Sequence, residues 1–234
     1  MTSDIRRTRT GPQGGPPLLA PVIAYSVLMV TAVALLSRVP QPGAPAAAVL
    51  GYDQAHQTVM RVAGCFAFAA SLPLAIWTAT AYRRLRTLGV TAPGAVIGLS
   101  GGLLAATSLA LSGLLTWTSG QLGDANTPAV ARALTDLGFA VGSAGFVVPL
   151  GLLAAGIAVP ALILRLTARP LAWAGLVIAA ARLLATLTLL TPALDATLPA
   201  GRFAGLAWLI AVSVALPRNR HGVAAMAGRT QVTA

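Results

Sequence analysis

The stretch GAVIGLSGGLLAATSLALSGLLTWT, residues 94–118, decides the fold class of this chain. It contains no charged residue, and a helix of this length is long enough to cross the hydrocarbon core of a bilayer. The rest of the chain has the same character, because its 234 residues are 56% hydrophobic and 9% charged, with a mean hydropathy of +0.80. Soluble domains carry about a quarter charged residues. The sequence therefore predicts an integral membrane protein.

Five further apolar runs of similar length flank this stretch. They cover residues 18–38, 58–82, 136–162, 170–191 and 201–217. Clusters rich in proline, glycine and polar residues separate them, as is typical of turns. We therefore predict an all-α polytopic membrane helix bundle of six transmembrane helices over residues 18–217, with an N-terminal tail at 1–17 and a C-terminal tail at 218–234.

The arginines predict the orientation of this bundle. They gather in the two tails and in the loops after the second and fourth runs, as Arg6, Arg7, Arg9, Arg83, Arg84, Arg86, Arg165, Arg169, Arg218, Arg220 and Arg229. By the positive-inside rule these segments are cytoplasmic, so both termini are expected inside a bacterial plasma membrane, next to its anionic inner leaflet. The net charge of +11 is then a consequence of topology. Because the arginines are dispersed, they do not indicate nucleic-acid binding.

The first run has an alternative interpretation. A basic leader precedes it and the small residues APAAA follow it, as in a cleaved signal peptide. Its apolar core is longer than that of a signal peptide, so we expect an uncleaved anchor.

Glycines recur at four-residue spacing in three of the predicted spans. They are Gly94, Gly98 and Gly102, then Gly138 and Gly142, then Gly201 and Gly205. Such faces let helix backbones approach closely, and we expect them to pack within the bundle rather than between copies of the chain. The fourth helix is expected to begin at the outer surface, with Thr127 as its cap, Pro128 in its first turn and an Arg132–Asp136 pair.

Motifs for catalysis or metal binding are weak. The segment GLSGG at 98–102 resembles the serine motif of rhomboid-type intramembrane proteases, but Ser100 is out of reach of the two histidines, His56 and His221. Asp53 and His56 supply two ligands without a third, and we interpret them as a solvated pair in the first outer loop. We predict no catalytic residue, no metal and no cofactor, and hence a protein that is not an enzyme.

Arg182 interrupts the apolar run GLVIAAARLLATLTLL at residues 175–190. Counted along the helix, it lies close to the middle of the bilayer, where a charge is costly and needs partners. Pro73 and Pro149 kink their helices and free the carbonyls of Ala69 and Gly145 at a similar depth. Arg182 is thus predicted to face the bundle interior and to join the kinked helices, either structurally or around a small polar or anionic cavity.

Hydroxyl groups in the same half of the bilayer are expected to complete this cluster. They belong to Ser71, Thr107, Ser108, Ser143 and Thr186.

Four segments resemble a family of uncharacterised bacterial multi-pass membrane proteins, classed as a domain of unknown function. They are PLAIWTATAYRRLRTLG, VVPLGLLAAGIAVPAL, LAWAGLVIAA and GRFAGLAWLIAVSVALP. The resemblance implies the six-helix fold and brings no activity. We expect a non-enzymatic accessory, sensory or stress-related component of the plasma membrane. A small transporter with a polar cavity near Arg182 is the alternative, followed by an intramembrane enzyme. A membrane-protein partner and a homo-oligomer both remain open.

Overall fold

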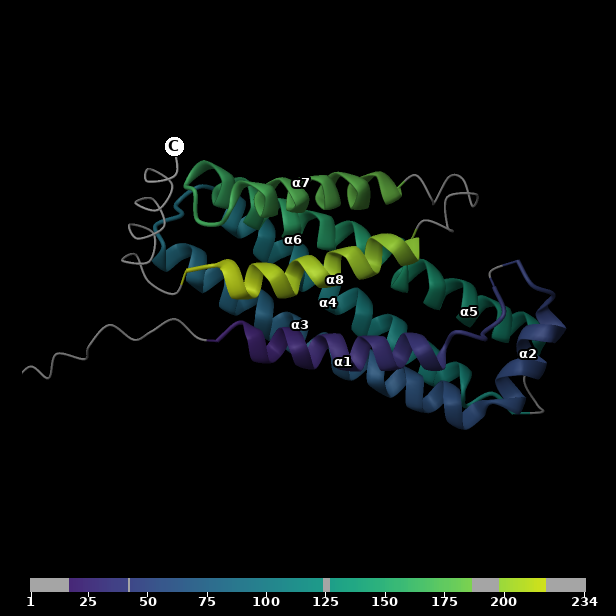
Figure 1. Ribbon diagram of the computed structural model, residues 1–234. Helices are drawn as coiled ribbons and strands as arrows, with labels where there is room; N and C mark the ends of the chain where they lie inside the picture. Colours follow the sequence, from purple (N-terminus) through teal and green to yellow (C-terminus); the bar gives the residue numbers. More distant parts are fainter. Residues whose placement is uncertain (1–16, 42, 124–126, 187–197, 218–234) are drawn as a thin grey trace, which may run out of the picture.

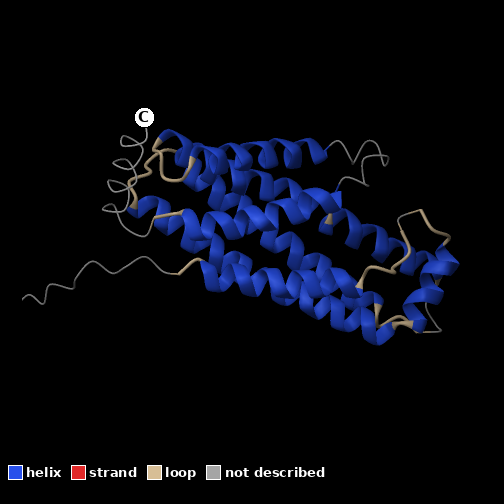
Figure 2. Cartoon of the chain, viewed as in Figure 1, coloured by secondary structure: helices blue, strands red, loops and turns tan. Residues whose placement is uncertain are grey.

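The structure is a computed structural model that describes residues 17–41, 43–123, 127–186 and 198–217, without the side chains of 198–202. All regular structure in these ranges is helical, which confirms the predicted all-α class (Figures 1 and 2). The helices are α1 (Leu19–Leu35), α2 (Ala46–Ala55), α3 (Gln57–Thr87), α4 (Gly94–Ser119), α5 (Pro128–Gly142), α6 (Ala144–Ile163), α7 (Arg169–Leu184) and α8 (Leu198–Ala215). The C-terminal tail and most of the N-terminal one lie outside the described residues.

Three helical segments are long and apolar enough to cross a membrane: α3, α4 and the nearly continuous pair α5–α6. The helices α1, α7 and α8 are shorter and run beside them over much of the bundle (Figure 1). The start of α1 and the end of α8 lie at one end of the bundle, and α2 lies at the other. Six helical segments therefore correspond to the six predicted apolar runs.

Two differences from the predicted elements stand out. The loop expected after the first run contains α2, which joins α3 at His56 and packs on α5. The fourth predicted span is broken at Ser143, whose φ is −97° and whose ψ is −93°. Gly142, directly before the break, has low helix propensity and weakens the helix there. Pro149 and Pro73 both lie inside uninterrupted helices, α6 and α3.

Glycines form the seams between neighbouring helices, as predicted. A β carbon at Gly98 would contact the backbone of Gly156 at 3.5 Å, which places α4 directly against α6. Gly64 of α3 and Gly113 of α4 lie so close that a β carbon at either would overlap the backbone of the other helix. Small residues at such contacts are typical of helix packing in membranes. The predicted pattern did not include Gly64, Gly113 or Gly156.

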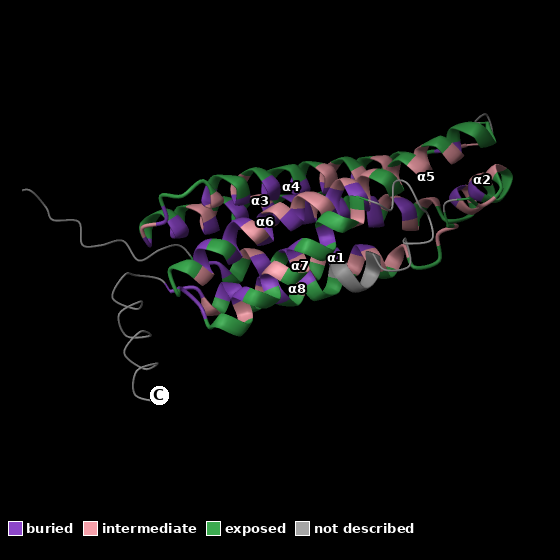
Figure 3. Cartoon of the chain, turned by 90° about the horizontal axis from the view of Figure 1, so that it is seen from above, coloured by how far each residue is buried: buried purple, intermediate pink, exposed green. Residues whose placement is uncertain are grey.

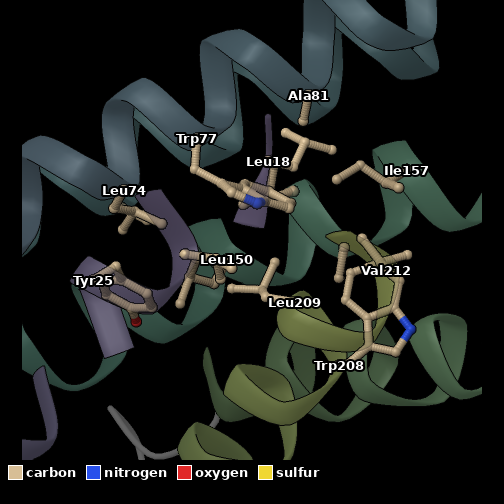
Figure 4. Close-up of a cluster of buried hydrophobic side chains, with 14 of the residues drawn as sticks. Leu18, Tyr25, Leu74, Trp77, Ala81, Leu150, Ile157, Trp208, Leu209 and Val212 are labelled. Atoms are coloured by element: carbon tan, nitrogen blue, oxygen red, sulfur yellow. The ribbon is translucent and has the colours of Figure 1, made fainter. Parts of the chain in front are cut away.

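The core gathers around the middle of the bundle, where α1, α3, α6 and α8 meet (Figure 4). Trp77 of α3 points into it between Leu18, just before α1, and Leu150 of α6, and Leu209 of α8 lies beside them. The outward side of the bundle, green in Figure 3, includes large apolar residues: Ile76 is 60% exposed, Val177 65% and Ile163 72%. Large exposed apolar surfaces of this kind indicate contact with lipid or with another protein.

Candidate functional site

Arg182 is buried inside the bundle, with only 4% of its surface exposed. It lies in the last turn of α7, and its side chain passes between two glycines on neighbouring helices. A β carbon at Gly151 of α6 would meet the Cβ of Arg182 at 3.1 Å, and one at Gly205 of α8 would overlap the guanidinium. The absence of side chains at these two positions therefore makes the room that the arginine occupies.

The hydroxyls predicted around Arg182 are divided between the interior and the surface. Thr107 and Thr186 are exposed. Thr107 donates to the carbonyl of Leu103 in its own helix at 3.0 Å, and Thr186, just after α7, donates to that of Leu183 at 2.8 Å. Their assignment to the interior cluster was therefore wrong. A threonine hydroxyl in a helix readily bonds the carbonyl three or four residues earlier, and this bond leaves the side chain free to face outward.

Three further members of the predicted cluster, Ser143, Gly145 and Ser108, lie around the break between α5 and α6. Ser143 is buried at the break itself, and its carbonyl accepts the amides of Phe146 and Val147 that begin α6. Gly145 lies against the carbonyl of Ala140 and near the hydroxyl of Ser108, at 3.4 and 3.8 Å from an added β carbon.

The two members on α3 contact their own helix or lie at its side. Ser71 is buried and donates to the carbonyl of Phe68 at 2.6 Å, and Ala69 is half-buried. The hydroxyl of Ser71 therefore satisfies a carbonyl of the turn before it, close to the position of Pro73.

Helix α8 is held by polar contacts that the sequence reasoning missed. The indole nitrogen of Trp77 on α3 donates to the hydroxyl of Ser213 at 2.8 Å, inside the core. Trp208 of α8 donates to the carbonyl of Leu171 at 2.9 Å, so α8 is tied to α7 as well. Buried indoles need such acceptors. The signal was present in the sequence as tryptophans inside apolar runs, but nothing in the pattern indicated their partners.

Arg84, assigned from sequence to a cytoplasmic loop, is instead buried at the end of α3, with 2% of its surface exposed. Its guanidinium donates to the carbonyl of Leu216 at 3.4 Å, just beyond α8. A cation close to the carboxyl end of a helix interacts favourably with the helix dipole. Arg84 thus fastens the end of α8 to the end of α3.

Asp53 is the clearest correction to the sequence interpretation. It lies on the buried face of α2, with none of its surface exposed, whereas a solvated position was expected. Within the described residues neither of its carboxylate oxygens accepts a hydrogen bond. Burial raises the pKa of Asp53 to about 6. Its sequence neighbour His56 is exposed and stacks on the ring of Tyr52, with 4.2 Å between the ring centroids.

Glutamine and arginine side chains hold the end of the bundle around α2. Gln57 donates to the carbonyl of Leu122 at 2.8 Å, and Arg61 donates to that of Gly120 at 2.8 Å. The predicted Arg132–Asp136 pair is present at 2.7 Å. Thr127 takes the backbone position of a helix cap without a capping bond from its side chain.

Among the described residues, no group of three histidine, cysteine or acidic side chains could hold a metal ion. Ser100 is exposed on α4, and His221 lies outside the described residues. Two shallow surface pockets of about 270 and 250 Å³ are lined by residues 54–59 and by Gly64, Cys65, Phe68, Leu114 and Trp117. Neither pocket contains Arg182.

No protein-family model, curated protein or solved structure matches this chain. The class of protein is therefore taken from the structure alone: a helical bundle with three segments long and apolar enough to cross a membrane.

Proposed function

We propose that this chain is a six-span protein of the bacterial plasma membrane that acts as a non-enzymatic accessory or sensory component. In this topology α1, α3, α4, α5–α6, α7 and α8 cross the bilayer, and both termini are cytoplasmic. Two observations support it: the apolar outward surface of the bundle, and the arginines gathered in the tails, at the end of α3 and around the junction of α6 and α7. The end of the bundle that carries α2 then faces outside.

The packing around Arg182 favours a closed bundle over a transporter. A transport pathway through the membrane requires a polar cavity that connects a buried charge to water. The guanidinium is instead pressed against Gly205, and the stem of the side chain against Gly151. Supported by these contacts, our proposal assigns Arg182 a structural role in joining α6, α7 and α8.

The polar ties of α8 support the same conclusion. Trp77, Arg84 and Trp208 connect α8 and the residue after it to α3 and α7 at three levels of the bundle. These contacts oppose a movement of α8 relative to α3 and α7. A helix tied in this way suits a bundle that stays closed.

Cysteine accessibility distinguishes the two functions. In a Cys65→Ser background, single cysteines replace Ala179 or Ala154, which are both buried at 2% exposure, and Ala92 in the loop before α4 serves as the exposed control. The protein in lipid nanodiscs is treated with a small charged methanethiosulfonate reagent. A closed bundle predicts reaction at position 92 alone. Reaction at 179 or 154 as fast as at 92 would contradict the closed bundle and favour the transporter.

A further inference from the structure

Helix α2 covers the end of the bundle that the proposed topology places outside. It packs on α5, with smaller contacts to α3. Its apolar contact is small and separate from the main core: the buried residues are Val49, Leu122 and Ala131. Few apolar side chains therefore hold α2 in place, so a single unfavourable group in the contact has a large influence on docking.

Asp53 is such a group. It lies one turn after Val49 on the face that α2 buries. Neither carboxylate oxygen finds a hydrogen-bond donor among the described residues, and buried oxygens of Thr135 and Asp136 on α5 also lack partners there. An ionised carboxylate buried without a partner is strongly disfavoured, whereas its protonated form is tolerated far better.

Charged and titratable groups around α2 are already engaged or exposed. On α5, Arg132 is paired with Asp136 and also donates to the carbonyl of Ala44. On α3, Arg61 donates to the end of α4, and His56 is exposed at the junction with α2. The described end of α4, residues 119–123, carries no charged side chain. Asp53 is thus buried in the contact without a counter-ion among the described residues.

We propose that α2 is a proton-responsive cap, docked when Asp53 is protonated and loosened when Asp53 ionises. Acidification of the medium outside the cell then closes the cap on α5, and neutral medium releases it. The sidedness of this response rests on the proposed topology. Gln54, which donates to the carbonyl of Gly123 at 3.2 Å, and Gln57 keep the junction of α2 and α3 attached in both states. The loosening is therefore a local movement of α2, and the bundle stays folded.

The docking of α2 can be measured by the reaction rate of a buried cysteine. In a Cys65→Ser background, Val49→Cys reports the buried face, and Ala48→Cys on the exposed face is the control for the pH dependence of thiol reactivity. The full chain in nanodiscs is labelled with a maleimide from pH 5 to pH 8, and the rate at 49 is divided by the rate at 48. We expect this ratio to rise at least tenfold with pH, around a midpoint near pH 6.

Two substitutions of Asp53 test whether it is the responding group. Asn is the neutral isostere of the protonated acid, so Asp53→Asn should keep the ratio low at every pH, and Asp53→Ala should also abolish its rise. His56→Gln should leave the rise intact. Histidine commonly titrates in the same range, so loss of the rise in His56→Gln would overturn the proposal. A flat ratio in the chain that keeps Asp53, or an undiminished rise in Asp53→Asn, would also overturn it.

The side of the membrane is tested separately. Intact cells that carry Ala48→Cys are treated with a membrane-impermeant maleimide before and after permeabilisation. Labelling before permeabilisation is expected. Labelling only afterwards would overturn the proposed topology and the response to the outside medium, while the pH dependence in nanodiscs would show whether the cap itself responds to protons.

Discussion

The guanidinium of Arg182 lies so close to the α carbon of Gly205 that a β carbon at position 205 would overlap it. This contact joins α7 to α8 at a buried charge, and it explains why an arginine is accommodated in an apolar segment. The glycine provides the space, and the arginine fills it.

Gly205→Ala should lower the thermal stability of the detergent-solubilised protein, because the new methyl group must displace a buried guanidinium. Overpacking of this kind costs about 1–3 kcal/mol. Thermal unfolding followed by size-exclusion chromatography measures the loss. Gly51→Ala on the exposed side of α2, where a β carbon meets nothing within 4 Å, is the control and should be neutral or slightly stabilising. In an Arg182→Ala background the loss at position 205 should disappear; an equal loss there would show that the arginine is not the obstacle.

Gly156→Ala should destabilise the bundle more than Gly205→Ala. A β carbon at Gly156 would overlap backbone atoms of Gly94 and Gly98 on α4, and backbone cannot move aside as the end of a side chain can. The matched control is Gly145→Ala in the same helix, whose nearest contacts of 3.4 and 3.8 Å are close to ordinary van der Waals distances. Equal melting temperatures for the two variants would contradict the close approach of α4 and α6.

Ser213→Ala should cost about 1–3 kcal/mol, because it leaves the buried indole nitrogen of Trp77 without its acceptor. Thr107→Ala removes a hydroxyl that is exposed and bonded to its own helix, so it should be nearly neutral. Thermal unfolding of both variants in the same detergent gives the comparison. If Ser213→Ala and Thr107→Ala had the same melting temperature, the hydrogen bond between Trp77 of α3 and Ser213 of α8 would contribute nothing to stability.

The helices were far easier to predict from sequence than the contacts between them. Each of the six predicted apolar runs overlaps a helix or a helix pair in the described residues, since length and hydropathy are properties of the chain alone. Only α3, α4 and the pair α5–α6 are long and apolar enough to cross a membrane. The break at Ser143 and the helix α2 were missed, because the first is a change of backbone angles at one residue inside an apolar run and the second is held by packing on α5.

The candidate site shows the same division. That Arg182 is buried could be inferred from its place in an apolar run, whereas its neighbours Gly151 and Gly205 depend on which helices become adjacent. The hydroxyls of Thr107 and Thr186 were misplaced, because depth along a helix does not specify which face a residue occupies. Asp53 was misplaced because its burial comes from a helix that the sequence did not indicate.

Stability should fall as the pH rises, because the pKa of Asp53 is raised to about 6 in the folded chain, above its ordinary value of 3.8. The folded state then binds the proton more tightly than the unfolded state, so the stabilisation is complete below about pH 4 and is lost as the pH passes through 6. Asp53→Asn should therefore melt higher than the chain with Asp53 at pH 7.5, with a smaller difference at pH 4.5. If the difference in melting temperature between Asp53→Asn and the chain with Asp53 were the same at both pH values, Asp53 would make no such contribution.

Topology mapping tests the central claim, a six-span bundle with both ends in the cytoplasm, most directly. Paired reporter fusions, one active only in the cytoplasm and one only outside, are placed after residue 217 and in the loop between α4 and α5. The account predicts a cytoplasmic signal after 217 and an outside signal between α4 and α5. An outside signal after residue 217, or a cytoplasmic signal from the α4–α5 loop, would contradict it.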